Sequence, residues 1–166
     1  AIIDGGSNQS HIQGPVYQRG NGTKFFPVGN GTTYLPVEIS GIGSASEIGV
    51  TLFDFSSPQT FEFNAELSDV SASRYWEVDV VSGSLAGSQI SLPIHGDEDF
   101  STNDLTRFVV AQSASSPISF ESLGVSSATG TAANGRIVSG EAVTASLVSI
   151  GVLSEGISVY NAISAN

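Results

Sequence analysis

The chain has 166 residues, of which 16 are acidic and 5 basic, so its formal net charge is −11. A polyanion with so few cations cannot neutralise phosphate groups, so no nucleic-acid partner is expected and anionic membrane surfaces are poor partners. The chain contains no cysteine, which excludes disulfide bonds, cysteine-based zinc sites and cysteine nucleophiles. The length predicts a single domain over residues 1–166 that can bury a core without such crosslinks.

Turn-forming residues divide the chain into short segments rich in β-branched and aromatic side chains. This spacing predicts an all-β fold: an antiparallel two-sheet β-sandwich of the jelly-roll or immunoglobulin-like type, with little or no helix. The predicted strands cover residues 12–19, 23–28, 33–40, 47–55, 59–66, 74–81, 88–94, 106–112, 118–121, 135–139, 142–150 and 156–163. Residues 142–150 also permit a helical turn.

Residues 24–40, KFFPVGNGTTYLPVEIS, predict a hairpin that turns at Asn30-Gly31. A type I′ turn is expected there, because both of its central residues need positive φ and Asn and Gly adopt it most easily. Each arm carries a proline, Pro27 or Pro36. Proline lacks a backbone N–H and is tolerated at a strand end or on an edge strand. The hairpin is therefore expected near the rim of a sheet.

The segment Trp76-Glu77-Val78-Asp79-Val80 alternates apolar and acidic residues, as a strand with one wet face does. The chain as a whole predicts the following core: Phe26, Val28, Val37, Ile39, Leu52, Phe53, Phe61, Phe63, Trp76, Val78, Ile90, Leu92, Phe108, Val110 and Leu123. Leu52 and Phe53 are neighbours and cannot both point inward along a regular strand, so one of them is expected at a rim or an interface.

No catalytic residues are predicted. Glu77 and Asp79 match the first two positions of the Glu-x-Asp-x-x-Glu motif that laminarinase-like β-sandwich glycosidases carry, but Ser82 occupies the third. Retaining hydrolysis needs two carboxyl groups in attacking and protonating roles. The two histidines, His11 and His95, have no Gly-x-Ser-x-Gly elbow to work with and are read as ordinary loop or strand-end residues.

The acidic stretch GDEDFSTNDLTRF offers the best candidate for a cofactor, a calcium ion. Calcium takes six to eight oxygen ligands from flexible loops. The candidate ligands are Asp97, Asp99, Ser101, Asn103 and Asp104. An EF-hand does not match, because Thr102 stands where the invariant glycine belongs. The alternative is a solvated acidic loop in which Asp97 or Asp99 bonds to local N–H groups.

Several segments together carry a family resemblance: HIQGPVYQRGNGTKFFPVGNGTTYLPVEIS, RYWEVD, DLTRFVVAQ, FESLGVSSATGTAANGRIVSG and AVTASLVSIGVLS. Over residues 11–153 the chain resembles the β-rich modules of large Bacteroidota cell-surface and secreted, adhesin-like proteins. It departs from them at Phe120, where those modules have tryptophan, and at Leu147 and Ile150, where aromatics are more usual. The resemblance implies an extracellular location and a β architecture, and no catalytic activity.

The chain begins with Ala1 rather than methionine, so we expect a secreted, processed product. Membrane insertion is not expected, because the apolar run 142–154 is shorter than the roughly 20 residues of a membrane helix. Asn8, Asn21 and Asn30 each begin an Asn-x-Ser/Thr triplet, the acceptor sequence for glycans in secreted proteins.

The ends of the chain, residues 1–10 and 155–166, are predicted to be strands exchanged between subunits. The apolar residues that would make those contacts are Ile2, Ile3, Ile157, Val159, Tyr160 and Ile163. The functional hypothesis is a non-enzymatic extracellular structural protein whose partners are copies of itself, assembled into a cell-surface fibre or adhesive assembly.

The alternative hypothesis is a calcium- or carbohydrate-binding module of a large surface adhesin, with surface glycans as partners. Carbohydrate-binding proteins stack sugar rings on exposed aromatic side chains. Because Trp76 is expected in the core, this stacking platform would have to come from Tyr17, Tyr34 and Tyr160. An exposed Trp76 beside a tyrosine would favour this alternative.

Overall fold

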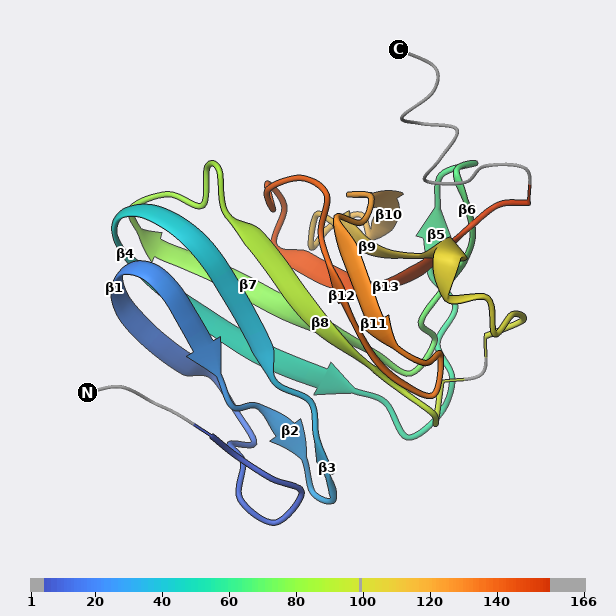
Figure 1. Ribbon diagram of the computed structural model, residues 1–166, viewed down its shortest axis with the longest axis horizontal. Helices are drawn as coiled ribbons and strands as arrows, with labels where there is room; N and C mark the ends of the chain where they lie inside the picture. Colours follow the sequence, from blue (N-terminus) through green and yellow to red (C-terminus); the bar gives the residue numbers. More distant parts are fainter. Residues whose placement is uncertain (1–4, 99, 156–166) are drawn as a thin grey trace.

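The computed structural model describes residues 5–98 and 100–155 (Figure 1). The all-β prediction is confirmed: in these ranges the only helical segment is the 3-10 turn η1, Leu105–Arg107. No helix in the described ranges is both long enough and apolar enough to cross a membrane. The strands are β1 Val16–Phe26, β2 Gly29–Asn30, β3 Thr33–Tyr34, β4 Val37–Asp54, β5 Glu62–Phe63, β6 Leu67–Val70, β7 Arg74–Ser82, β8 Gln89–His95, β9 Phe108–Ser113, β10 Ser119–Ser122, β11 Ser127–Gly130, β12 Asn134–Val138 and β13 Leu147–Leu153.

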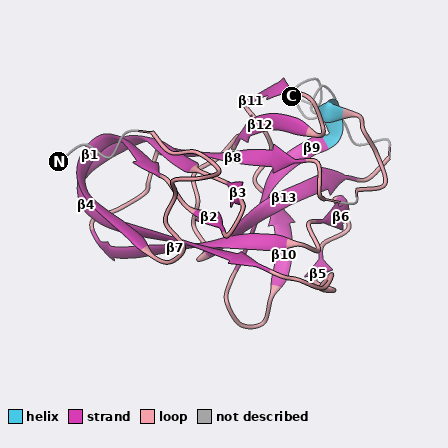
Figure 2. Ribbon diagram, turned by 90° about the horizontal axis from the view of Figure 1, so that it is seen from below, coloured by secondary structure: helices cyan, strands magenta, loops and turns pink. Residues whose placement is uncertain are grey.

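The strands form one hydrogen-bonded path rather than two separate sheets. Its order is β11-β12-β8-β4-β7-β13-β9-β10-β5, with β1 also paired to β4 and β6 to β13; β2 and β3 form a ribbon of their own. Figure 2 shows β8 and β12 on one side and β7 and β10 on the other, joined at the end that holds β1 and β4. The sandwich is therefore closed along one side by a shared strand.

That shared strand is β4, which predicted segments 33–40 and 47–55 each cover in part. Its beginning, residues 38–40, pairs with β8, and residues 47–54 pair with β7. Gly41 lies between the two pairings and has φ +74°, a conformation that only glycine adopts easily. The predicted strands end at residue 40 and begin again at residue 47, whereas the structure has Gly41 as a bend inside one long strand that passes from one layer to the other.

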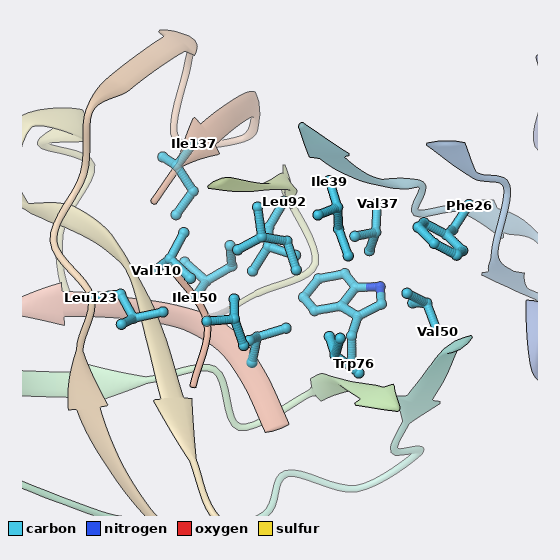
Figure 3. Packing of buried hydrophobic residues seen from close by; sticks show 14 of the residues in the cluster. Phe26, Val37, Ile39, Val50, Trp76, Leu92, Val110, Leu123, Ile137 and Ile150 are labelled. Carbon is cyan, nitrogen blue, oxygen red and sulfur yellow. The ribbon is translucent and has the colours of Figure 1, made fainter. Parts of the chain in front are cut away.

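The main core fills the space between the layers. Figure 3 shows Ile39 and Leu92 from one layer pointing toward Trp76 and Ile150 from the other. Trp76 is fully buried, and its Nε1 donates to the carbonyl oxygen of Leu35 at 3.3 Å. This bond satisfies the one polar group that the indole ring brings into the core.

A second, smaller core lies on the far face of β13. Val148, Ile150 and Val152 of β13 belong to the main core, whereas Leu147 and Leu153 belong to the second. Every residue of β13 is buried. A strand covered on both faces shows no polar alternation, which is why the sequence locates it imprecisely, at 142–150.

The core prediction is confirmed at most positions. The buried members are Phe26, Val28, Val37, Ile39, Trp76, Val78, Ile90, Leu92, Phe108, Val110 and Leu123. Leu52 and Phe61 are half-buried, and the prediction is wrong for Phe53 and Phe63, which are 38% and 39% exposed. Leu52 packs against the main core, and its neighbour Phe53 faces outward, as strand alternation requires.

The predicted hairpin over 24–40 is only partly correct. Phe26 of β1 pairs with Val37 of β4, and the short β2–β3 ribbon extends beyond that pair. Pro27 follows the last residue of β1 and Pro36 precedes the first residue of β4. Neither proline occupies a strand, so each marks the junction between the long ladder and the ribbon.

The type I′ turn is wrong. No described non-glycine residue has positive φ, and Gly31 is not among the glycines that do. The side-chain oxygen of Asn30 instead accepts a hydrogen bond from the backbone N–H of Thr33 at 3.0 Å. Asparagine thus serves at the start of the turn as an acceptor rather than at its centre through left-handed geometry.

Other boundaries also differ from the prediction. β1 runs through residues 20–22, the break between the predicted strands 12–19 and 23–28, with register shifts on either side of Gly22. Segments β6 and β11 were not predicted, and 59–66 contributes only the two residues of β5. β5 pairs in parallel with β10, so the sheet is mixed rather than purely antiparallel.

Replacing Trp76 by alanine should lower the free energy of unfolding by about 3–5 kcal/mol, because the indole ring lies at the centre of the main core. The control Val81→Ala, at a side chain that is 53% exposed, should change it by no more than about 0.5 kcal/mol. Denaturant unfolding measures both. Equal effects of the two changes would contradict the packing described here.

Candidate functional site

A buried arginine gathers three carboxylates at one end of β7. The Arg74 side chain is 1% exposed. Its Nε donates to Asp54 Oδ1 at 2.8 Å, and its Nη1 and Nη2 donate to the two oxygens of Asp97 at 3.0 and 2.5 Å. Glu98 Oε1 lies 3.5 Å from Nη1. Burial alone would lower the pKa of Arg74, but the bond to Asp97 and the charges of Glu98 and Asp54 raise it, so the guanidinium stays charged.

Glu98 is the least satisfied member of this cluster. Its side chain is 1% exposed, its Oε1 accepts a hydrogen bond from the Ser71 hydroxyl, and its Oε2 has no hydrogen-bond partner among the described residues. Burial raises its pKa to about 7, against the opposing charge of Arg74. A cavity of about 200 Å3 lined by Ser71, Ser73 and Glu98 adjoins it, which is enough space for ordered water.

The candidate calcium ligands do not converge in the described part of the chain. Asp97 turns inward to Arg74 and also lies 2.7 Å from His95 Nδ1. Asp104 caps η1, where its Oδ1 accepts from Thr106 N at 3.0 Å and from Thr106 Oγ1 at 2.6 Å. Ser101 and Asn103 are exposed, and Asp99 lies outside the described residues. Within the described ranges no group of three or more acidic or histidine side chains is arranged to hold a metal ion.

Asp97 is therefore a partner of Arg74, which the sequence reading missed. Both carboxylate oxygens face the guanidinium, so a calcium ion would have to displace a bidentate ion pair to use them. Burial tends to raise the pKa of Asp97, but the hydrogen bonds from Arg74 and His95 lower it below its usual value. The sequence offered one signal for this pairing: Arg74 opens a core strand, where a cation needs a partner.

Glu77 and Asp79, weighed above as glycosidase carboxylates, lie on the outer face of β7. Trp76 and Val78 are buried, whereas Asp79 is exposed and Glu77 half-buried. The predicted wet face of this strand is thereby confirmed. Opposite Glu77 on β4 stands Thr51, and opposite Asp79 stands Gly49.

Tyr17 extends this outer face onto β1. It pairs with Gly49 of β4, which in turn pairs with Asp79 of β7. A Cβ added to Gly49 would lie 2.4 to 2.9 Å from three atoms of the Tyr17 ring, so the ring rests directly on the glycine backbone. The Tyr17 hydroxyl lies 3.4 Å from Asp79 Oδ2, and half of the side chain is exposed, at 50%.

The three tyrosines named as a sugar platform have different environments. Tyr17 is exposed, Tyr34 is half-buried with its ring stacked on His11, and Tyr160 lies outside the described residues. Trp76 is buried, so the exposed Trp76 that would favour a carbohydrate-binding module is not found. Of the acceptor asparagines, Asn21 is exposed, whereas Asn8 accepts a bond from Tyr34 N and Asn30 from Thr33 N.

One edge of β7 lies open beside a groove. The N–H of Val78 donates to the carbonyl oxygen of Ser146 at 2.7 Å, and pairing with β13 covers only Trp76 and Glu77. From Val80 onward no described backbone group pairs with β7 on that side. The space there is a groove of about 720 Å3, lined mainly by small and apolar residues including Val80, Leu85 and Val143.

The residues predicted to mediate assembly cannot be placed. Ile2, Ile3, Ile157, Val159, Tyr160 and Ile163 all lie outside the described residues. The predicted exchanged strands 1–10 and 155–166 are described only in part. Ser7 bridges to Ser10, Asn8 Oδ1 accepts a hydrogen bond from Tyr34 N at 2.8 Å, and Glu155 ends the described range.

Comparison of the chain with protein-family models, with curated protein sequences and with solved structures finds no match. The resemblance to Bacteroidota surface modules therefore stays a prediction.

Glu98 should make the protein less stable as the pH rises. Because its pKa is about 7 in the folded state and near 4.5 when unfolded, its contribution to stability is fully present below the unfolded value and is lost as the pH rises through about 7. Glu98→Gln should flatten the stability profile over this window and raise stability at pH 8. Melting curves at several pH values test this, with the exposed Glu62→Gln as control. If the stability profiles of the parent and Glu98→Gln have the same slope, the raised pKa assigned to Glu98 is contradicted.

Asp97→Asn should destabilise the fold whether or not calcium is present. The substitution removes a charged, bidentate partner from a buried guanidinium, at a cost of about 1–3 kcal/mol. The melting temperature of the variant should lie below that of the parent, and this difference should be the same in millimolar calcium and in EDTA. A rise in the parent's melting temperature with calcium, absent from the variant, would instead favour the calcium site.

Proposed function

We propose that this chain is a non-enzymatic extracellular structural protein, a self-assembling subunit of a cell-surface fibre or adhesive assembly. Its composition supports this role: most of its polarity is uncharged, and it carries no cysteine. The single observation on which the proposal depends is the open edge of β7 beside an apolar groove. An open edge next to apolar pockets is what an added strand requires.

The edge of β7 is suited to accept a strand. In a strand, the backbone N–H and C=O groups of residues two apart point to the same edge. The N–H and C=O of Val80 therefore point to the same edge as the Val78 N–H that donates to Ser146. An incoming strand would continue the pairing that β13 begins. The Val80 side chain, 41% exposed, would be covered in the groove.

Other edges carry features that discourage pairing. The outer edge of β1 holds Arg19 and Lys24 and is distorted by register shifts at Gly20 and Gly22. Pro27 and Pro36 end the ladder between β1 and β4. Charges, bulges and prolines are the usual protection of sheet edges against unwanted association. Between Val80 and Ser82 the groove side of β7 carries no charge and no proline, and the register shift at Val81 lies in the ladder to β4.

The proposed donors are the chain termini, 1–10 and 155–166. Residues 157–163 alternate apolar and other residues with Ile157, Val159 and Ile163 on one side, as a donated strand would. Exchange between successive subunits is head-to-tail, and such contacts build a filament unless the rotation closes a ring.

Sedimentation and electron microscopy of the full chain test the proposal. The full chain should associate as its concentration rises, and deletion of residues 155–166 should leave a folded monomer. Val80→Lys, which puts a charge in the groove, should also give a monomer. The control Val81→Lys alters the exposed neighbour outside the groove lining and should still assemble.

A full chain that stays monodisperse at millimolar concentration would overturn self-assembly. A truncated chain that still polymerises would remove the C-terminal segment as the donor. Assembly that Val80→Lys leaves intact would move the contact away from β7.

A further inference from the structure

We propose that the outer face of β1, β4 and β7 binds a neutral polysaccharide, with Tyr17 as its stacking platform. Tyr17 separates this inference from assembly: it lies on the face of the sheet opposite to the one that Val78 and Trp76 bury, and it does not line the groove beside β7, although Asp79 does. The face is defined by residues at successive pairs across the three strands: Tyr17, Gly49, Asp79, Thr51, Glu77 and Phe53.

Tyr17 has the geometry of a rigid platform. One side of its ring lies on the backbone of Gly49, where no side chain intervenes, and its hydroxyl lies 3.4 Å from Asp79 Oδ2. Half of the side chain remains exposed. The core does not require this exposed ring. An aromatic face is apolar and electron-rich, so it attracts the C–H groups on one side of a pyranose ring. A ring already held in place loses little entropy when a ligand stacks on it.

Polar and charged side chains flank the platform on both sides. Asp79 is exposed, and Glu77 and Thr51 are half-buried on the same face, two residues farther along each strand. On the other side of Tyr17, Glu47 binds Arg19 through a 2.7 Å hydrogen bond. Carboxylates accept strong hydrogen bonds from hydroxyl donors. Sugars present such donors at the rim of a stacked ring.

A second exposed aromatic ring lies in line with the first. Phe53 follows Gly49 by four residues on β4, a distance of roughly 13 Å along a strand. Its ring packs against Tyr75 with centroids 5.2 Å apart, and it is 38% exposed. Two rings on one face, separated along the strand, fit an extended chain of several sugar units better than a single sugar.

Charge determines which polysaccharide fits. The protein carries a net charge of −11. The face presents Asp79 and Glu77 beside the platform, and its one nearby cation, Arg19, is paired to Glu47. Anionic polysaccharides are repelled by such a surface. The ligand class that the face fits is therefore a neutral polysaccharide rich in hydroxyl groups.

Affinity electrophoresis in native gels containing a soluble polysaccharide tests the inference. The probes are hydroxyethyl cellulose, mannan and, as the acidic contrast, polygalacturonate. We expect at least one neutral probe to retard the protein and polygalacturonate to have no effect. Tyr17→Ala should weaken the retardation about tenfold or more, and Asp79→Asn should weaken it by a smaller factor.

The matched control is Phe63→Ala, which removes an aromatic ring of similar exposure on β5, away from this face. It should be retarded like the parent. Melting curves confirm that each variant is folded. The inference is overturned if neither neutral probe retards the parent, if Tyr17→Ala is retarded equally, or if only polygalacturonate binds. A monomeric protein that binds mannan would leave this inference standing while the assembly proposal fails.

Discussion

The pairing of β4 with both layers is the constraint on which the rest of the structure depends. One strand of 18 residues bonds to β8 near its beginning and to β7 near its end, while β1 follows its opposite edge. The bend at Gly41 lets the same backbone leave one layer and enter the other. The core between the layers is closed on this side by a continuous ladder rather than by side chains alone. The outer face that holds Tyr17 and the open edge of β7 are both positioned by the second half of β4.

The few cations of the chain serve mainly inside the fold. Arg74 holds three carboxylates at the end of β7. Arg136 donates to the Ser91 hydroxyl at 2.6 Å and to the carbonyl oxygen of Pro36 at 3.0 Å, which links β12 and β8 to the segment before β4. Arg107 donates to the carbonyl oxygen of Leu153 at 2.7 Å. With three of the five basic residues used in this way, the remaining surface is strongly acidic. That surface favours uncharged partners and disfavours polyanions.

The sequence predicts what depends on local pattern. The alternation from Trp76 to Val80 correctly gives a strand with a buried aromatic and an acidic outer face. The sequence-based prediction fails where pairing with strands from distant parts of the chain sets the strand boundaries. The breaks at Asn21-Gly22 and Gly41 look like turns, yet tertiary pairing carries a strand through both. β13 lacks alternation because a second core covers its other face.

The environments of Asp97 and Tyr17 also depend on contacts between distant parts of the chain. Asp97 lies in an acidic stretch that is typical of calcium sites. In the folded protein, however, Arg74, which lies 23 residues earlier in the chain, donates to both of its carboxylate oxygens. Tyr17 is one of three tyrosines that the sequence offers as a platform. What distinguishes it is the absence of a side chain at Gly49, on another strand. Neither relation can be read from spacing, because each depends on which strands become neighbours.

Native-state hydrogen exchange tests most directly whether β4 unites the two layers. If the shared strand makes the sandwich one cooperative unit, the protected amides of β8, of both halves of β4 and of β7 should exchange with the same free energy of opening. Low concentrations of denaturant should lower these values together. The account is contradicted if the amides of β8 and β12 open at a distinctly lower free energy while those of β7 and β13 remain protected, since the layers would then unfold separately.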